Sequence, residues 1–143
     1  MVVGVNVTID ELMQPQVMTA TPHQSVGHVR KVMSEHKVSA MPVVDPEGHP
    51  VGIVTATDML DDHKDATPIS QVMASPVYTV PRYDGPHIAA RVMRNHHLHH
   101  VVVTEAKEVV GMISSFDLLQ LVEDHRFVAK QGPTPSKKRK GRD

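Results

Sequence analysis

Two short segments carry hydroxyl and carboxylate side chains at a spacing that suits nucleotide binding. In each, an apolar run leads to a hydroxyl residue followed three positions later by an aspartate: Thr55 with Asp58, and Ser114 with Asp117. If the run is a buried strand that enters a helix, the free N–H groups and positive end of that helix attract phosphate. The carboxylate can accept hydrogen bonds from both hydroxyls of a ribose. Taken singly, each segment is more typical of a hydroxyl that caps a helix with an acidic first turn.

The two segments belong to an internal repeat of about sixty residues. At a shift of 60 the matching pairs are Met13 with Met73, Val17 with Val77, Thr19 with Thr79 and Met33 with Met93. The second copy has one residue fewer after Glu105, and the shift becomes 59 for Gly52 with Gly111, Asp58 with Asp117 and Leu60 with Leu119. A deletion in a turn is well tolerated. The chemistry of the two segments therefore lies at equivalent places in two copies of one unit.

Each copy predicts the same order of elements. Thr8 with Glu11 predicts a capping box ahead of a first short helix, and Thr67 with Pro68 predicts the N-cap and first position of its counterpart. Next come extended segments (17–21 and 77–80), amphipathic helices starting near Ser25 and Pro86, paired strands (41–44 with 51–54, 101–103 with 109–113) and closing helices (57–62 and 116–124). The sequence predicts an α+β fold of two helix-strand-helix-strand-strand-helix repeats. Because a unit of this size is marginal alone, we expect the two to pack through their sheets.

Composition narrows the classes of function. The 143 residues contain no cysteine, which excludes disulfides, thiolate catalysis and cysteine-ligated metals, and only 3% are aromatic. Neither a membrane-spanning stretch nor a signal peptide is evident, so we expect a cytoplasmic protein with no membrane contact. Nucleophile-elbow, P-loop and dinucleotide-binding motifs are absent, and we expect no enzyme activity.

The charge is unevenly distributed along the chain. The net charge is −1, but the last seven residues hold five Lys/Arg against one Asp, which leaves the rest at −5. An acidic body argues against nucleic acid as its main ligand. We predict a first repeat over residues 1–66, a second over 67–128 and a disordered basic tail over 129–143.

The repeated motif resembles the CBS domain pair, also called the Bateman module. The resemblance covers roughly residues 8 to 126 and rests on the strand-to-helix motif in both copies. Met13 and Met73 before the extended segments, and the stretch from Val38 to Asp45 after the amphipathic helix, add to it. The resemblance implies two clefts related by a pseudo-twofold axis, each drawing on both repeats.

The resemblance also assigns residues to each cleft. One repeat supplies hydroxyls and an aspartate for phosphate and ribose, and the other supplies its first strand and the backbone before its second strand for the base. One cleft would use Thr55, Thr57 and Asp58 with Thr79, Leu98 and His99. The other would use Ser114 and Asp117 with Thr21, Val38, Ser39 and Ala40.

The resemblance implies a regulatory module that senses AMP, ADP, ATP, S-adenosylmethionine or NAD, and a homodimer in which modules associate into a flat disk. Two alternatives stay open. One is a ligand-free structural dimerisation module, and the other is a nucleic-acid-associated protein that uses the basic tail.

The second copy departs from the pattern at two positions. Val102 stands where the first copy has Pro42, and Phe116 stands where it has Thr57. The change to Phe116 removes a hydroxyl and adds bulk, whereas the change to Val102 keeps an apolar strand. We therefore expect the Asp58 cleft to be the tighter one. His99 adds an imidazole that titrates close to neutral pH, so its phosphate contact should strengthen as pH falls.

Eleven histidines include a cluster from His96 to His100. The cluster spans the end of a predicted helix and the start of a strand, so we expect no single ion to be held by all of it. The nine methionines fall largely at core spacing and predict packing rather than a metal site.

Overall fold

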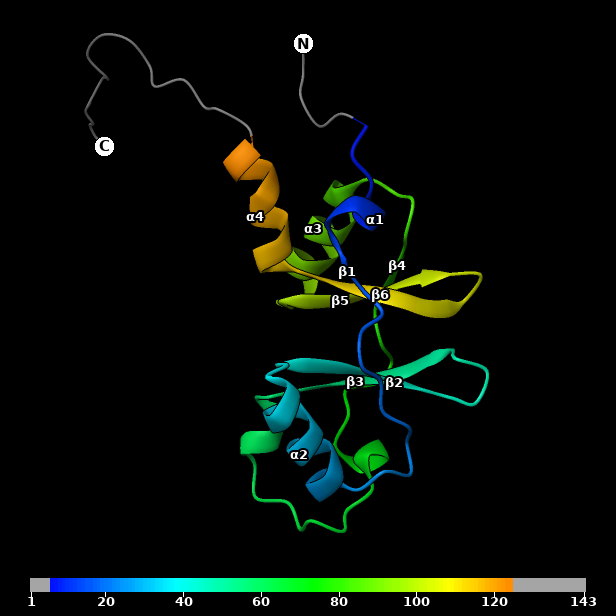
Figure 1. Cartoon of the computed structure of the whole chain (residues 1–143), viewed down its shortest axis with the longest axis vertical. Coiled ribbons are helices and arrows are strands. Elements are labelled where there is room, and N and C mark those ends of the chain that lie inside the picture. Colours follow the sequence, from blue (N-terminus) through cyan, green and yellow to red (C-terminus); the bar gives the residue numbers. More distant parts are fainter. Residues whose placement is uncertain (1–5, 125–143) are drawn as a thin grey trace, which may run out of the picture.

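The two repeats form two facing halves, each with helices on the outer side of a small sheet (Figure 1). The computed structural model describes residues 6–124. In chain order the elements are α1 (Ile9–Leu12), β1 (Gln14–Pro15), α2 (Val26–His36), β2 (Ala40–Val44), β3 (Pro50–Thr55), the 3₁₀ turns η1 (Asp58–Leu60) and η2 (Ile69–Gln71), β4 (Thr79–Pro81), α3 (Pro86–His96), β5 (His100–Glu105), β6 (Glu108–Ser114) and α4 (Ser115–Asp124). The predicted α+β class is confirmed.

The helices begin where local chemistry predicts. The Ser25 hydroxyl accepts a hydrogen bond from the His28 N–H at 3.1 Å and so caps α2, and Pro86 is the first residue of α3. Ahead of α1, the predicted capping box is present, and in it the Thr8 N–H donates to Glu11 Oε2 at 3.2 Å. These local signals fix the first residues of α1, α2 and α3.

The strands of both halves follow one plan. The larger sheet has the order β1-β6-β5-β4, with β4 parallel to β5 and the other pairs antiparallel. In the first half β2 and β3 form an antiparallel pair, and single bridges add Ala20 beside Val43 and Ala74 beside Ile53. Each half therefore takes an edge segment from the opposite repeat: β1 pairs with β6, and Ala74 pairs with β3.

The first helices are exchanged between the halves as well. Ile9, Leu12 and Met13 belong to the core that surrounds α3, whereas Ile69 belongs to the core that surrounds α2. Arg82 ties α1 down, because its Nε donates to Asp10 Oδ1 at 2.7 Å and a terminal nitrogen donates to Glu105 at 2.8 Å. The repeats are interlocked rather than merely adjacent.

The exchange of segments between the repeats concerns the predicted division of the chain into residues 1–66, 67–128 and 129–143. The boundary between residues 66 and 67 stays a prediction, and the predicted tail over 129–143 lies outside the described residues.

Three predicted elements are wrong in detail. The closing helix over 57–62 is only the η1 turn, because Leu60 remains 83% exposed and the polar residues after it offer nothing to bury. Pro68 rather than Thr67 precedes η2, so the second capping assignment fails. Between residues 17 and 21, Ala20 alone makes a strand-type bridge.

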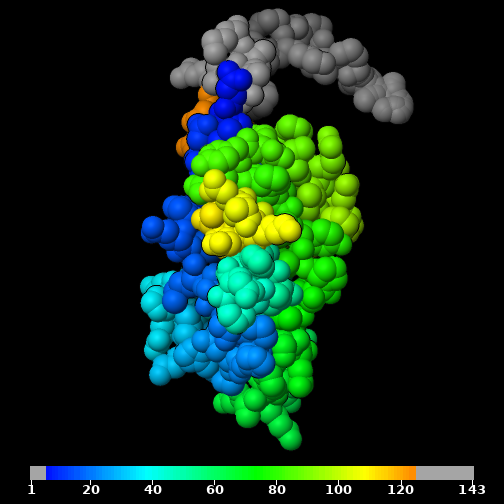
Figure 2. Space-filling model, turned by 90° about the vertical axis from the view of Figure 1, so that its right-hand side faces the viewer, coloured from blue at the N-terminus to red at the C-terminus, as the bar shows by residue number. Residues whose placement is uncertain are grey.

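The turns of the two hairpins meet at one end of the interface between the halves. The Val109 N–H donates to the Gly48 carbonyl at 3.1 Å, and Gly48 has the positive φ of +84° that favours glycine. Figure 2 shows this contact between the teal and yellow segments. Neither hairpin turn lies at the opposite end of the interface (Figure 1). Within residues 6–124, no helix has the length and apolar character needed to cross a bilayer.

Candidate functional site

A cavity of about 380 Å³ lies where the two halves meet. Its lining comes from 55–58 in the first repeat, from 76–78 and 97–100 in the second, and from Ser39, Ile53 and Ala74. This size is in the range of small-molecule sites. The cavity is called the Asp58 cavity below.

The strand-to-turn junction places Asp58 at this cavity with one oxygen free. Asp58 Oδ2 accepts hydrogen bonds from the Thr55 N–H at 2.8 Å and from the Thr55 hydroxyl at 3.1 Å. These bonds fix the carboxylate at the end of β3. Among residues 6–124 no donor reaches Asp58 Oδ1. That oxygen can accept a hydrogen bond from a ligand.

A second cavity of about 370 Å³, the Asp117 cavity, repeats this plan with the roles of the repeats reversed. It is lined by 14–18, 37–40, Met112, Ser114, Asp117 and His100. The Ser114 N–H donates to Asp117 Oδ2 at 2.8 Å, and the Asp117 N–H donates to the Ser114 hydroxyl at 3.0 Å. Here the other oxygen is occupied, because Gln14 Nε2 donates to Asp117 Oδ1 at 3.2 Å.

The structure brings most of the predicted site residues together in these two cavities. Of the first predicted set, Thr55, Thr57, Asp58, Leu98 and His99 line the Asp58 cavity. Of the second set, Ser114, Asp117, Val38, Ser39 and Ala40 line the Asp117 cavity.

Thr79 and Thr21 are the two predicted residues outside the lining. Thr79 lies in β4 opposite Val102, and Thr21 follows the bridge at Ala20. The walls are formed instead by the residues just before them, 76–78 and 16–18.

The two departures of the second copy lie away from the cavities. Val102 is fully buried in β5 and does not line the Asp58 cavity, so it does not obstruct the base side. Phe116 is 78% exposed and is not part of the Asp117 lining. The expected loss of a hydroxyl at Phe116 stands, but its bulk does not fill the cavity.

His100 and Ser39 form a wall shared by both cavities. His100 Nε2 lies 3.5 Å from the Ser39 hydroxyl. Burial lowers the pKa of His100 below its ordinary value, the positive charge of His99 lowers the pKa further, and Asp117 opposes this. A neutral imidazole therefore separates the two sites at neutral pH.

The other histidines of the cluster point to different neighbours. The His96 ring stacks on Tyr78 with 3.9 Å between the centroids, and His99 Nδ1 lies 3.4 Å from the Ser115 hydroxyl. His97 follows α3 as its C-cap and has the left-handed conformation. Residues 97–100 of the cluster line the Asp58 cavity, and His96 reaches it only through its stack on Tyr78.

The wall residues that sequence reasoning missed include Gln14, Tyr78 and His100. The sequence held a partial indication of Gln14 and Tyr78. The segments before Thr19 and Thr79 are equivalent, and their side chains differ between the two copies. Gln14 is equivalent to Ala74, and Tyr78 is equivalent to Met18. These differences make the two cavities chemically unequal.

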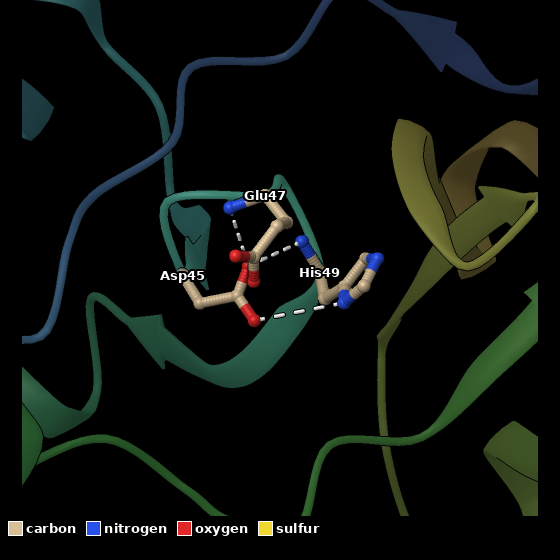
Figure 3. A group of neighbouring side chains, drawn as sticks. All are labelled: Asp45, Glu47 and His49. Carbon is tan, nitrogen blue, oxygen red and sulfur yellow. Dashed lines mark hydrogen bonds and ion pairs between the residues drawn. The ribbon is translucent and has the colours of Figure 1, made fainter.

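A separate cluster of Asp45, Glu47 and His49 lies in the turn between β2 and β3 (Figure 3). Asp45 Oδ1 accepts hydrogen bonds from the Glu47 N–H at 3.0 Å and the His49 N–H at 2.9 Å. Asp45 Oδ2 lies 3.6 Å from His49 Nδ1. The arrangement is that of an aspartate that closes a turn, as the Asp45–Gly48 sequence predicts.

Comparisons with known proteins agree with this architecture. An uncharacterized protein of Methanocaldococcus jannaschii, MJ1404, is 28% identical over 134 residues, which cover 81% of this chain and 32% of that protein. The chain spans about a quarter to a third of the length of the first curated relatives that it matches.

Solved structures share the fold. The CBS domain pair of protein MJ0100, in complex with 5′-methylthioadenosine and S-adenosyl-L-methionine, superimposes with a TM-score of 0.75 at 24% identity, covering 82% of this chain and 96% of that one. CBSX2 in complex with AMP gives a TM-score of 0.73 at 19% identity, covering 81% and 96%.

The CBS domain pattern matches this sequence twice, over residues 9–64 and 69–124. These two stretches carry the two strand-to-helix junctions, the exchanged first helices and both cavities. The chain belongs to the CBS domain family.

Proposed function

We propose that this chain is a regulatory module that binds an adenine nucleotide or a related adenosyl ligand in the Asp58 cavity. The observation that carries the proposal is the free Oδ1 of Asp58 in a cavity of about 380 Å³. A ribose hydroxyl offers the donor that this oxygen lacks. AMP, ADP, ATP, S-adenosylmethionine and NAD all contain such a ribose.

The rest of the cavity suits the other parts of the ligand. The Thr57 hydroxyl and His99 line the cavity and can contact phosphate. Tyr78, braced by its stack on His96, offers an aromatic face to a base. Two solved pairs of the same fold hold adenosyl ligands, namely AMP in one and S-adenosyl-L-methionine with 5′-methylthioadenosine in the other.

The Asp58 cavity is proposed as the tighter of the two. It keeps both hydroxyls, Thr55 and Thr57, while Phe116 replaces the second hydroxyl in the other repeat. In the Asp117 cavity a ligand must also displace Gln14 from the carboxylate. Displacing a hydrogen bond to a carboxylate costs affinity.

We also propose that the module forms a homodimer through α4. Phe116, Leu119 and Val122 recur every three residues along α4 and are 78%, 55% and 54% exposed. An exposed apolar stripe of this kind is typical of an interaction site. A second copy is the occupant that the resemblance to CBS pairs implies. The cytoplasmic location remains an expectation.

A ligand screen tests the proposal. Thermal unfolding of the full chain is measured with AMP, ADP, ATP, S-adenosylmethionine and NAD, with guanosine nucleotides as the control. A ligand at about 100 times its dissociation constant should stabilise the fold by about 2.7 kcal/mol. If no adenosyl ligand shifts the transition or gives heat in calorimetry, the ligand-free dimerisation module becomes the better interpretation. The nucleic-acid alternative depends on the tail, which lies outside the described residues, and is tested by salt-dependent DNA or RNA binding.

A further inference from the structure

A third cavity, of about 510 Å³, lies beside the Asp58 cavity in the second repeat. It is formed by the last turns of α3, the residues that link α3 to β5 and the start of α4. Met93 and Leu118 contribute apolar parts of its wall.

This cavity and the Asp58 cavity share a wall. His97, Leu98 and His99 line both of them, so the two spaces lie on either side of one short segment. A ligand seated in the Asp58 cavity with its phosphate near His99 would need to extend past this segment to enter the third cavity. The polar side chains that line the third cavity determine which chemical group of a ligand could enter it.

Those groups are cationic or hydrogen-bond donors. Arg94, His97, His99 and the hydroxyl of Ser115 all line the cavity. No carboxylate is among its lining residues in the described part of the chain. Within residues 6–124 the arginine ion pairs are those of Arg30 and Arg82, so the Arg94 guanidinium has no acidic partner there. A guanidinium beside imidazoles and a hydroxyl is suited to phosphate oxygens.

The equivalent place in the first repeat lacks this character. The counterparts of Arg94 and Ser115 are Ser34 and Ala56, and the cavity there measures about 200 Å³. Its arginine, Arg30, is already engaged, donating to Asp65 at 3.2 Å and to the Met59 carbonyl at 3.3 Å. The cationic cavity is therefore a property of the second repeat rather than of the shared fold.

We propose that this cavity binds phosphate groups, and that Arg94 and His97 there hold the outer phosphates of a nucleotide di- or triphosphate whose nucleoside occupies the Asp58 cavity. Only the placement of the nucleoside in the Asp58 cavity rests on the proposed function; the phosphate site does not. It makes Arg94 a determinant of the number of phosphates, so that ADP and ATP are distinguished from AMP.

The test is calorimetric titration of the full chain with AMP, ADP, ATP and inorganic tripolyphosphate, in EDTA, for the parent and for Arg94→Gln. Arg91→Gln is the matched control, because Arg91 lies on the same helix, is exposed and lines neither cavity. Arg94→Gln should weaken ATP about tenfold, the effect of losing one hydrogen bond to a charged group, and should weaken tripolyphosphate as well. It should change AMP less than about twofold, and Arg91→Gln should leave all four affinities near those of the parent.

Two outcomes would overturn the inference: Arg94→Gln altering AMP and ATP equally, or changing neither ATP nor tripolyphosphate. If AMP binds in the second case, the proposed function stands and this inference fails. If AMP does not bind but tripolyphosphate binds in an Arg94-dependent way, the phosphate site stands and the nucleoside assignment fails. If neither AMP nor tripolyphosphate binds, both are overturned.

Discussion

Gln14 Nε2 donates a hydrogen bond to Asp117 Oδ1 at 3.2 Å, whereas the equivalent position beside Asp58 is occupied by Ala74, which has no side-chain donor. Gln14 therefore occupies, in one cavity, the oxygen that stays free in the other. This one difference between the repeats gives a physical reason for unequal affinity in a symmetric architecture.

Removing this hydrogen bond should open the weaker cavity. We expect Gln14→Ala to increase affinity at the Asp117 cavity by up to about tenfold, because a ribose no longer competes with the amide for the carboxylate. Affinity at the Asp58 cavity should be unchanged. Calorimetry with a two-site fit measures both. The reciprocal variant, Ala74→Gln, should weaken the Asp58 cavity, and a Gln14→Ala protein that retains the parental weak site would contradict this account.

The stability of the fold should depend on pH through His100. Burial, with the positive charge of His99, lowers the pKa of His100 in the folded state below its ordinary value of 6.5. The unfolded chain then binds the proton more readily, so the contribution of His100 is intact above pH 6.5 and is lost as pH falls from there through the lowered folded pKa.

Replacing His100 tests this dependence. His100→Gln should lose less thermal stability than the parent between pH 7.5 and 5.5, because glutamine stays neutral and can still reach Ser39. His99→Ala should also lose less thermal stability than the parent over this pH range, because it removes a neighbouring positive charge that lowers the pKa of His100. Identical pH slopes of the unfolding temperature in parent and His100→Gln would refute the assigned role.

The α4 stripe should control self-association. Leu119→Glu should weaken dimerisation by at least about tenfold, because it places a charge in an interface that is otherwise apolar. Sedimentation equilibrium over a concentration series measures this. Tyr83→Glu is the control, since Tyr83 is 62% exposed but lies outside α4. If the Leu119→Glu protein dimerises like the parent, the dimer interface does not lie on α4.

Local features were predictable from the sequence, and contacts between distant segments were not. Ser25 and Pro86 signal helix starts within a few residues, and the two junctions at Thr55 and Ser114 depend on spacing within one turn. The sixty-residue repeat then placed both junctions at one interface. Spacing and repeat together indicated Thr55, Asp58, Ser114 and Asp117. The resemblance to CBS pairs supplied the other predicted residues, and ten of the twelve line the two cavities.

The remaining features depend on long-range packing. Gln14 and Asp117 are 103 residues apart in the chain, and Ile9 packs in the core of the opposite repeat. The closing helix after Thr57 was overpredicted, because Asp62 stands where α4 has Leu121, which packs against the core. Nothing in the local pattern of Tyr78 indicates that His96 will stack on it.

The most direct test of the central claim is AMP binding to Asp58→Ala, measured by calorimetry beside the parent and the matched variant Asp117→Ala. Thermal unfolding first establishes that each variant is folded. We predict that Asp58→Ala weakens the tight site by about 1.5 to 3 kcal/mol, the loss of a hydrogen bond to a charged acceptor, while Asp117→Ala leaves that site within about twofold. Equal AMP affinity in a folded Asp58→Ala protein and the parent would contradict the assignment of the Asp58 cavity as the nucleotide site.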